Sequence, residues 1–140
     1  MFNVNLETME IKMHRGDTGS FKLRATRESG TAWTEDDRGL FTIKNQQGET
    51  MLQRFYRLDD QWSLGDGVIL VEFHNDDTDT WETGQYTTEF RCDVSPIWEG
   101  TPPGGRCVNA LTANARLIEG PLVRTTIQST LTILGVLGDI

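Results

Sequence analysis

The chain has 140 residues, of which 36% are hydrophobic and 24% are charged, and it contains six Phe and four Trp. This composition predicts a single globular domain over residues 1–140 and excludes an intrinsically disordered chain. The net charge is −8, and all of it comes from residues 1–93, which hold ten Lys/Arg against eighteen Asp/Glu. An acidic body of this kind argues against binding to nucleic acid or to anionic membrane surfaces, because both require a basic face.

The chain lacks a run of about 18 apolar residues, and its first residues lack the charged and apolar regions of a signal peptide. We therefore expect a soluble protein that is made in the cytoplasm. The two cysteines, Cys92 and Cys107, are too few for a disulfide framework. They could pair and close a loop rich in Pro and Gly, but two buried thiols are favoured because nothing indicates an oxidising compartment.

Apolar residues recur with a period of two, which predicts β-strands with one buried face. The predicted strands are 9–13, 21–25, 40–44, 50–58, 67–73, 85–94 and 123–134. In the strand 85–94, Tyr86, Thr88, Phe90, Cys92 and Val94 share one face. Gly48 in the sequence NQQGE predicts a hairpin turn between the third and fourth strands. About seven strands without alternating helices predict an all-β, antiparallel β-sandwich.

Two segments depart from this strand pattern. The sequence NDDTDTW, residues 75–81, predicts a single helical turn that Asn75 could cap. Residues 95–114 predict a long irregular loop, and loops of that length are usually functional.

Residue patterns that carry catalysis are missing from the sequence. His14 and His74 lie at predicted strand ends and fit no metal spacing, and neither a nucleophile elbow nor a phosphate-binding loop occurs. We therefore expect a protein that is not an enzyme and that uses no cofactor. The candidate metal ligands are Asp76, Asp77 and Asp79, but their spacing differs from an EF-hand loop, and bonding to turn amides is the favoured interpretation.

The segment 78–86, TDTWETGQY, leads through Trp81 and Gly84 to Tyr86 at the start of a predicted strand. This pattern resembles a tyrosine corner, in which a Tyr hydroxyl bonds to the backbone a few residues upstream. The alternative is that Trp81 and Tyr86 form a stacking platform for a sugar. We favour the structural role, because the turn at Gly84 would direct Tyr86 back towards the corner.

Trp33, Trp62 and Trp98 all lie near turn signals. They either cover the open ends of the sandwich or contact a glycan or a protein partner. Trp98, with Pro102 and Pro103 beside it, is the preferred partner-binding candidate.

The C-terminal strand and tail, residues 122–140, break the alternation with a series of apolar side chains. Leu131 and Ile133 lie in the strand, and Val136, Leu137 and Ile140 follow it. This strand either runs through the centre of the sandwich or packs against another chain, since an exposed apolar edge would be adhesive. For residues 135–140 we favour packing against another chain.

The tripeptide Arg15-Gly16-Asp17 matches a well-known adhesion signal. Adhesive function requires it at the tip of an exposed loop, whereas here it lies in a short connection between two predicted strands. Gly16 can adopt a positive φ and Asp17 can bond to turn amides, so a tight turn is the favoured interpretation.

Four segments together carry a resemblance to a known family: IKMHRGDTGSFKLRAT, LFTIKNQQGE, GVILVEFHNDDTDTWETGQYTTEFR and VRTTIQSTLTILGVLGDI. In this order they resemble the immunoglobulin-like domains of phage tails and prophage elements, such as the N-terminal domain of baseplate upper proteins. The resemblance covers about 110 of the 140 residues. The long loop at 95–114 is not part of the family pattern.

This resemblance implies an immunoglobulin-like β-sandwich in a virion tail or baseplate, assembled in the bacterial cytoplasm. Such a domain would be an adaptor that links a rigid tail part to a fibre or receptor-binding module. Its partners would be other tail proteins and copies of itself, with at most indirect contact to host-surface glycans. The alternatives are a carbohydrate-binding module that uses Trp33, Trp62 or Trp98, and a bacterial adhesion domain.

Overall fold

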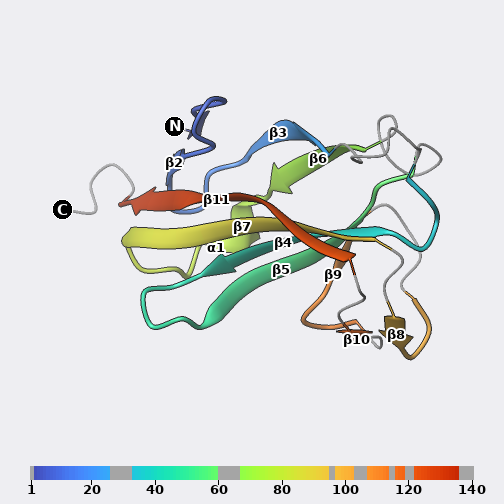
Figure 1. Cartoon of the computed structure of the whole chain (residues 1–140). Helices are drawn as coiled ribbons and strands as arrows, with labels where there is room; N and C mark the ends of the chain where they lie inside the picture. The colour runs from blue at the N-terminus through green and yellow to red at the C-terminus, as the bar shows by residue number, and fades with distance from the viewer. Residues whose placement is uncertain are drawn as a thin grey trace.

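The computed structural model describes residues 2–25, 33–59, 67–94, 97–102, 107–113, 116–118 and 122–135. These residues form eleven strands and one short helix (Figure 1). The elements are β1 (Asn3–Val4), β2 (Ile11–His14), β3 (Gly19–Arg24), β4 (Arg38–Lys44), β5 (Thr50–Arg57), β6 (Val68–Phe73), α1 (Asn75–Thr78), β7 (Gly84–Val94), β8 (Ile97–Glu99), β9 (Cys107–Asn109), β10 (Arg116–Ile118) and β11 (Leu122–Leu134). The fold is an all-β, sandwich-like fold, as the period of the apolar residues predicts.

The larger sheet has seven strands in the order β1-β2-β11-β7-β4-β5-β9. Within it, β11, β7, β4 and β5 follow the G-F-C-C′ order of variable-type immunoglobulin sandwiches, and β3 and β6 correspond to strands B and E. The long strands β7 and β11 pair along almost their whole length, with one register shift between Thr125 and Ile127. They form the middle of the sheet in Figure 1.

One pairing differs from the expected all-antiparallel arrangement. β2 runs parallel to β11, with Leu131 opposite Ile11 and Leu134 opposite His14. Alternation along a strand reports which face is buried but not the direction of the neighbour, so the sequence could not reveal this pair.

The core lies between the larger sheet and the two-stranded sheet of β3 and β6. Strict alternation in β3 buries Phe21 and Leu23 while Lys22 and Arg24 are exposed. From the opposite side, the larger sheet contributes apolar residues of five strands: Ile11, Met13, Phe41, Ile43, Leu52, Tyr56, Phe90, Cys92, Leu131 and Ile133. Burial of these side chains is the main source of stability, at roughly 1.5–3 kcal/mol for each large one.

The sequence left open whether the C-terminal strand runs through the sandwich or packs against another chain, and the structure shows the first arrangement. β11 lies inside the sheet, between β2 and β7, and Leu131 and Ile133 are buried in the core. The fold therefore explains the apolar character of this strand at Leu131 and Ile133. Val136, Leu137 and Ile140 lie outside the described residues.

Three local predictions were wrong. The first predicted strand, 9–13, begins only at Ile11, because Met9 has φ 61° and closes a turn with Asn5. The N-cap of α1 is His74 rather than Asn75, and its backbone N–H donates to Asp77 Oδ2 at 2.7 Å. The segment 95–114 is not irregular throughout, because it contains β8 and β9.

The hairpin at residues 45–49 is confirmed. The Asn45 N–H donates to the Glu49 carbonyl, and the Gly48 N–H donates to the Asn45 carbonyl. Gly48 has φ 81°. No atom lies within 4 Å of the place that a Cβ at Gly48 would take, so the positive φ alone explains why glycine suits this position.

Candidate functional site

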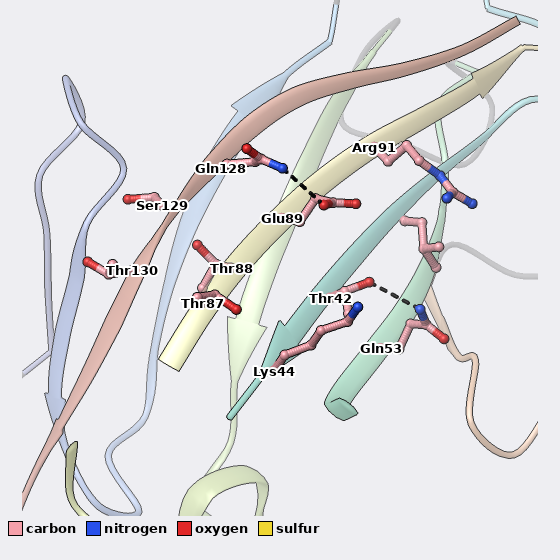
Figure 2. A pocket seen from close by; sticks show the side chains of 11 residues that line it. Thr42, Lys44, Gln53, Thr87, Thr88, Glu89, Arg91, Gln128, Ser129 and Thr130 are labelled. Carbon is pink, nitrogen blue, oxygen red and sulfur yellow. Dashed lines mark hydrogen bonds between the residues drawn. The ribbon is translucent and has the colours of Figure 1, made fainter. Parts of the chain in front are cut away.

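A groove of about 630 Å³ lies on the outer face of the larger sheet, on the side opposite the core. It crosses four adjacent strands, β5, β4, β7 and β11 (Figure 2). Its lining is mostly polar: Leu40, Thr42, Lys44, Gln53, Thr87, Thr88, Glu89, Arg91, Gln128, Ser129 and Thr130. This volume falls within the range of small-molecule binding sites.

The register of the strands arranges the lining side chains in rows across the sheet. In the central row, Thr42 lies opposite both Gln53 and Glu89, and Glu89 lies opposite Gln128. With strands about 4.8 Å apart, these four side chains span roughly 14 Å. They come from four strands that are distant in sequence, so only the sheet brings them together.

The next row towards the hairpin has Lys44, Thr87 and Thr130. On the other side of the central row, Leu40 lies opposite Phe55 and Arg91. The groove is therefore polar over two rows and partly apolar in the third.

Hydrogen bonds between side chains fix the central row. Gln53 Nε2 donates to Thr42 Oγ1 at 3.1 Å, and Gln128 Nε2 donates to Glu89 Oε2 at 3.4 Å. Both bonds are drawn in Figure 2. The lining contains neither Cys nor His, and Ser129 Oγ donates to the carbonyl of Thr8 at 3.0 Å. The lining groups can form hydrogen bonds with a bound ligand.

The third row, which contains Leu40, extends to Phe55, and Phe55 packs against Trp98 of β8. Phe55 is buried, and its ring meets the Trp98 ring edge-to-face at 5.2 Å between centroids. The Arg38 guanidinium lies 5.4 Å from the centre of the Trp98 ring. Trp98, the preferred partner-binding residue from the sequence, is thus half-buried and packs on the protein itself. Pro102 is exposed, and Pro103 lies outside the described residues.

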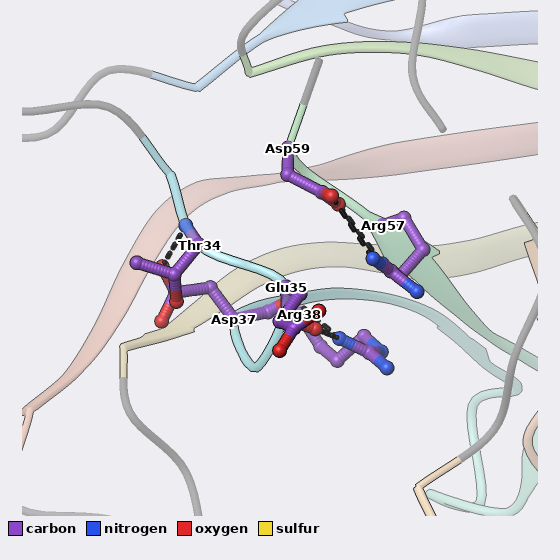
Figure 3. Close-up of polar contacts among 6 residues, drawn as sticks. All are labelled: Thr34, Glu35, Asp37, Arg38, Arg57 and Asp59. Carbon is purple, nitrogen blue, oxygen red and sulfur yellow. Dashed lines mark hydrogen bonds and ion pairs between the residues drawn. The ribbon is translucent and has the colours of Figure 1, made fainter. Parts of the chain in front are cut away.

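Charged side chains are buried at this same end of β4 and β5 (Figure 3). Arg57 and Asp59 form a bidentate ion pair with two N···O distances of 2.9 Å. Arg38 donates to the carbonyls of Glu35 and Asp37. Burial, followed by the charge of Arg57, lowers the pKa of Arg38 below its ordinary value. Satisfied bonds of this kind stabilise the turn before β4, so we assign the cluster a structural role.

At the corner, Trp81 and Tyr86 contact each other, and Gly84 lies between them in the chain. The Tyr86 hydroxyl donates to the carbonyl of Glu82 at 2.6 Å, and its ring lies 5.1 Å from that of Trp81. Both rings are buried, and Gly84 has φ 136°. Burial, followed by the charge of Glu82, raises the pKa of Tyr86. Rings buried in this way do not present a stacking face to a sugar.

The acidic residues of α1 do not converge. Asp77 forms an ion pair with Arg54 at 2.9 Å, while Asp76 and Asp79 are exposed. Within the described ranges, no group of three or more His, Cys, Asp or Glu side chains is placed to hold a metal ion.

The Arg15-Gly16-Asp17 segment is held against α1. The Gly16 N–H donates to Thr78 Oγ1 at 2.9 Å, and Asn75 Nδ2 donates to the Gly16 carbonyl at 3.0 Å. Asp17 Oδ2 accepts the backbone N–H of His14 at 2.8 Å. The tripeptide is a turn fixed at both its middle and its end, which is not the mobile tip that adhesion requires.

Trp33 and the cysteines also have defined positions. Trp33 is buried, and its Nε1 donates to the carbonyl of Ala25 at 2.9 Å, so it belongs to the core. Trp62 lies outside the described residues. Cys92 and Cys107 do not form a disulfide; Cys92 is buried as expected, but Cys107 is exposed on the edge strand β9, which corrects the prediction of two buried thiols.

Comparison of the chain with protein-family models, curated proteins and solved structures returned no match. In the part of the chain that the structure describes, no helix is long and apolar enough to cross a membrane.

The sequence did not predict the groove. The polar residues that alternate with apolar ones in the predicted strands, such as Thr42 and Glu89, could have indicated a polar outer face.

Proposed function

We propose that this protein is a non-enzymatic structural protein of a phage or prophage virion, located in the tail or baseplate. It acts as an adaptor that links a rigid tail part to a fibre or receptor-binding module. Its partners are other tail proteins and further copies of itself, and assembly proceeds by burial of surface without any chemical step.

The observation that carries this proposal is the placement of the four segments that resemble phage tail domains. The first spans β2, the Arg15–Asp17 turn and β3, and the second spans most of β4 and its hairpin. The third runs from β6 through α1 and the tyrosine corner into β7, and the fourth includes most of β11. The segments thus coincide with the framework of the sandwich, in chain order, which supports a shared fold rather than a chance match of short motifs.

Surface features support a role in assembly. Among the described residues, the large hydrophobic side chains that are exposed are Leu6, Ile97, Leu111 and Leu134, at 72%, 56%, 53% and 38%. The six-residue strands β3 and β6 pair only with each other in the described part of the chain. A strand edge without a backbone partner can accept a further strand. Contacts of this type allow a small domain to bind rigid neighbours.

The reading frames that flank the coding sequence give the most direct test. We expect tail-tape, baseplate or fibre genes on at least one side. Flanks that hold only metabolic or secretion genes would contradict the proposal.

A biochemical test is the co-expression of this chain with the products of those flanking tail genes, followed by size-exclusion chromatography with light scattering. We expect a stable complex of defined stoichiometry. Replacement of Ile97 and Leu111 by Ser should weaken the complex, whereas Gln46→Ala, at an exposed position in the hairpin after β4, should not. A chain that stays monomeric at micromolar concentration and binds none of those products would overturn the role in assembly.

A further inference from the structure

The outer-face groove offers three kinds of contact within one site. Its central row provides amide, hydroxyl and carboxylate groups from Gln53, Thr42, Glu89 and Gln128. The flanking row provides the Lys44 ammonium with two threonine hydroxyls. The third row provides the Arg91 guanidinium, opposite Leu40, which is buried.

The central row can both donate and accept hydrogen bonds. Gln53 and Gln128 each direct one amide N–H within the row, and each amide group has a second N–H and an oxygen. Glu89 accepts the Gln128 bond through Oε2, and its other carboxylate oxygen is a further acceptor. Because donors and acceptors lie together over about 14 Å of a rigid sheet, they suit a ligand whose own groups both donate and accept hydrogen bonds.

The charged side chains of the groove indicate which class of ligand it can bind. Lys44 and Arg91 lie on opposite sides of the central row, and Glu89 lies between them. A strongly anionic ligand would meet Glu89 at the centre of the groove, in a protein with a net charge of −8. A purely apolar ligand would leave the polar rows without partners, which costs binding free energy.

We propose that this groove binds a neutral oligosaccharide. Sugar hydroxyls both donate and accept hydrogen bonds, which matches the central row. The site differs from a tryptophan platform, because Trp33 and Trp81 are buried and Trp98 is covered in part by Phe55 and Arg38. It does not depend on the virion role.

The test is a glycan array probed with the purified full-length chain, with neutral and acidic oligosaccharides in separate sets. Positive ligands are then titrated by calorimetry against the wild type and the variants Glu89→Gln and Gln128→Ala. We expect binding to neutral oligosaccharides, and a loss of affinity of about tenfold or more in each variant. Asp76→Asn removes the same charge as Glu89→Gln at an exposed position on α1, which contributes no lining residue, so it is the matched control and should bind like the wild type.

Amide NMR spectra of each variant test folding, and a titration of the wild type locates the ligand. Shift changes concentrated on β4, β5, β7 and β11 support the proposal even if one variant fails to fold. Three results would overturn it: an absence of binding at millimolar oligosaccharide, binding restricted to acidic sugars, or shift changes confined to residues outside the groove.

Discussion

Replacement of Thr78 by Val tests how firmly the Arg15–Asp17 turn is anchored. Thr78 is fully buried, and its Oγ1 accepts the Gly16 N–H at 2.9 Å across 62 residues of sequence. Val has nearly the same shape, so the change removes one acceptor and leaves the partly buried N–H without that bond. The cost of an unsatisfied buried donor is about 1–3 kcal/mol. For a chain of this length that corresponds to a decrease in Tm of roughly 3–10 °C.

Urea denaturation of the wild type and Thr78→Val measures this cost directly, with an unchanged m-value as the sign that only stability has altered. Thr80→Val, at an exposed position two residues further on, is the matched control and should leave the midpoint unchanged. Amide hydrogen exchange at Gly16 should become faster in Thr78→Val alone. A variant with wild-type stability and wild-type exchange at Gly16 would show that the turn is not held by this bond.

Three further predictions concern buried polar groups. Tyr86→Phe removes the bond to the Glu82 carbonyl and should cost about 0.5–1.5 kcal/mol in urea denaturation, whereas no change would argue against a stabilising corner. Asp59→Ala leaves the Arg57 guanidinium, 10% exposed, without its bidentate partner and should cost about 2–4 kcal/mol by the same measurement; a cost below 1 kcal/mol would contradict this. Burial, followed by the nearby Cys107, raises the pKa of Tyr56 above 10, so the unfolded chain loses this proton first. Stability should therefore decline as pH rises above about 10, by up to about 1.4 kcal/mol per pH unit, and less so in Tyr56→Phe; equal declines in both proteins would refute the assignment.

The residues that line the groove could be predicted only in part from the sequence. Alternation in the strand 85–94 correctly assigned Tyr86, Thr88, Phe90 and Cys92 to the buried face, and by elimination placed Glu89 on the other. The alternation of apolar and polar residues along one strand does not indicate which residue of the neighbouring strand lies opposite. Register is a property of the pair of strands, and it depends on turn geometry and on the fit of the whole core.

Residues near turns were the least predictable. Trp33 and Trp98 both lie beside turn signals, yet one is buried and the other half-buried against Phe55, because their surroundings come from remote segments. Tyr86 was predictable because its hydrogen-bond partner, Glu82, is only four residues away.

The sequence by itself determined the seven longer strands, the hairpin at Gly48, the buried face of each central strand and the local corner at Tyr86, since all of these depend on contacts within a few residues. It did not reveal the short strands β1, β8, β9 and β10. Only the tertiary structure decided the parallel pairing of β2 with β11, the anchoring of Gly16 by Thr78, and the row from Gln53 to Gln128. Those features join residues that are 11 to more than 100 positions apart. They form only when burial of the common core compensates for the entropy of closing the chain between them.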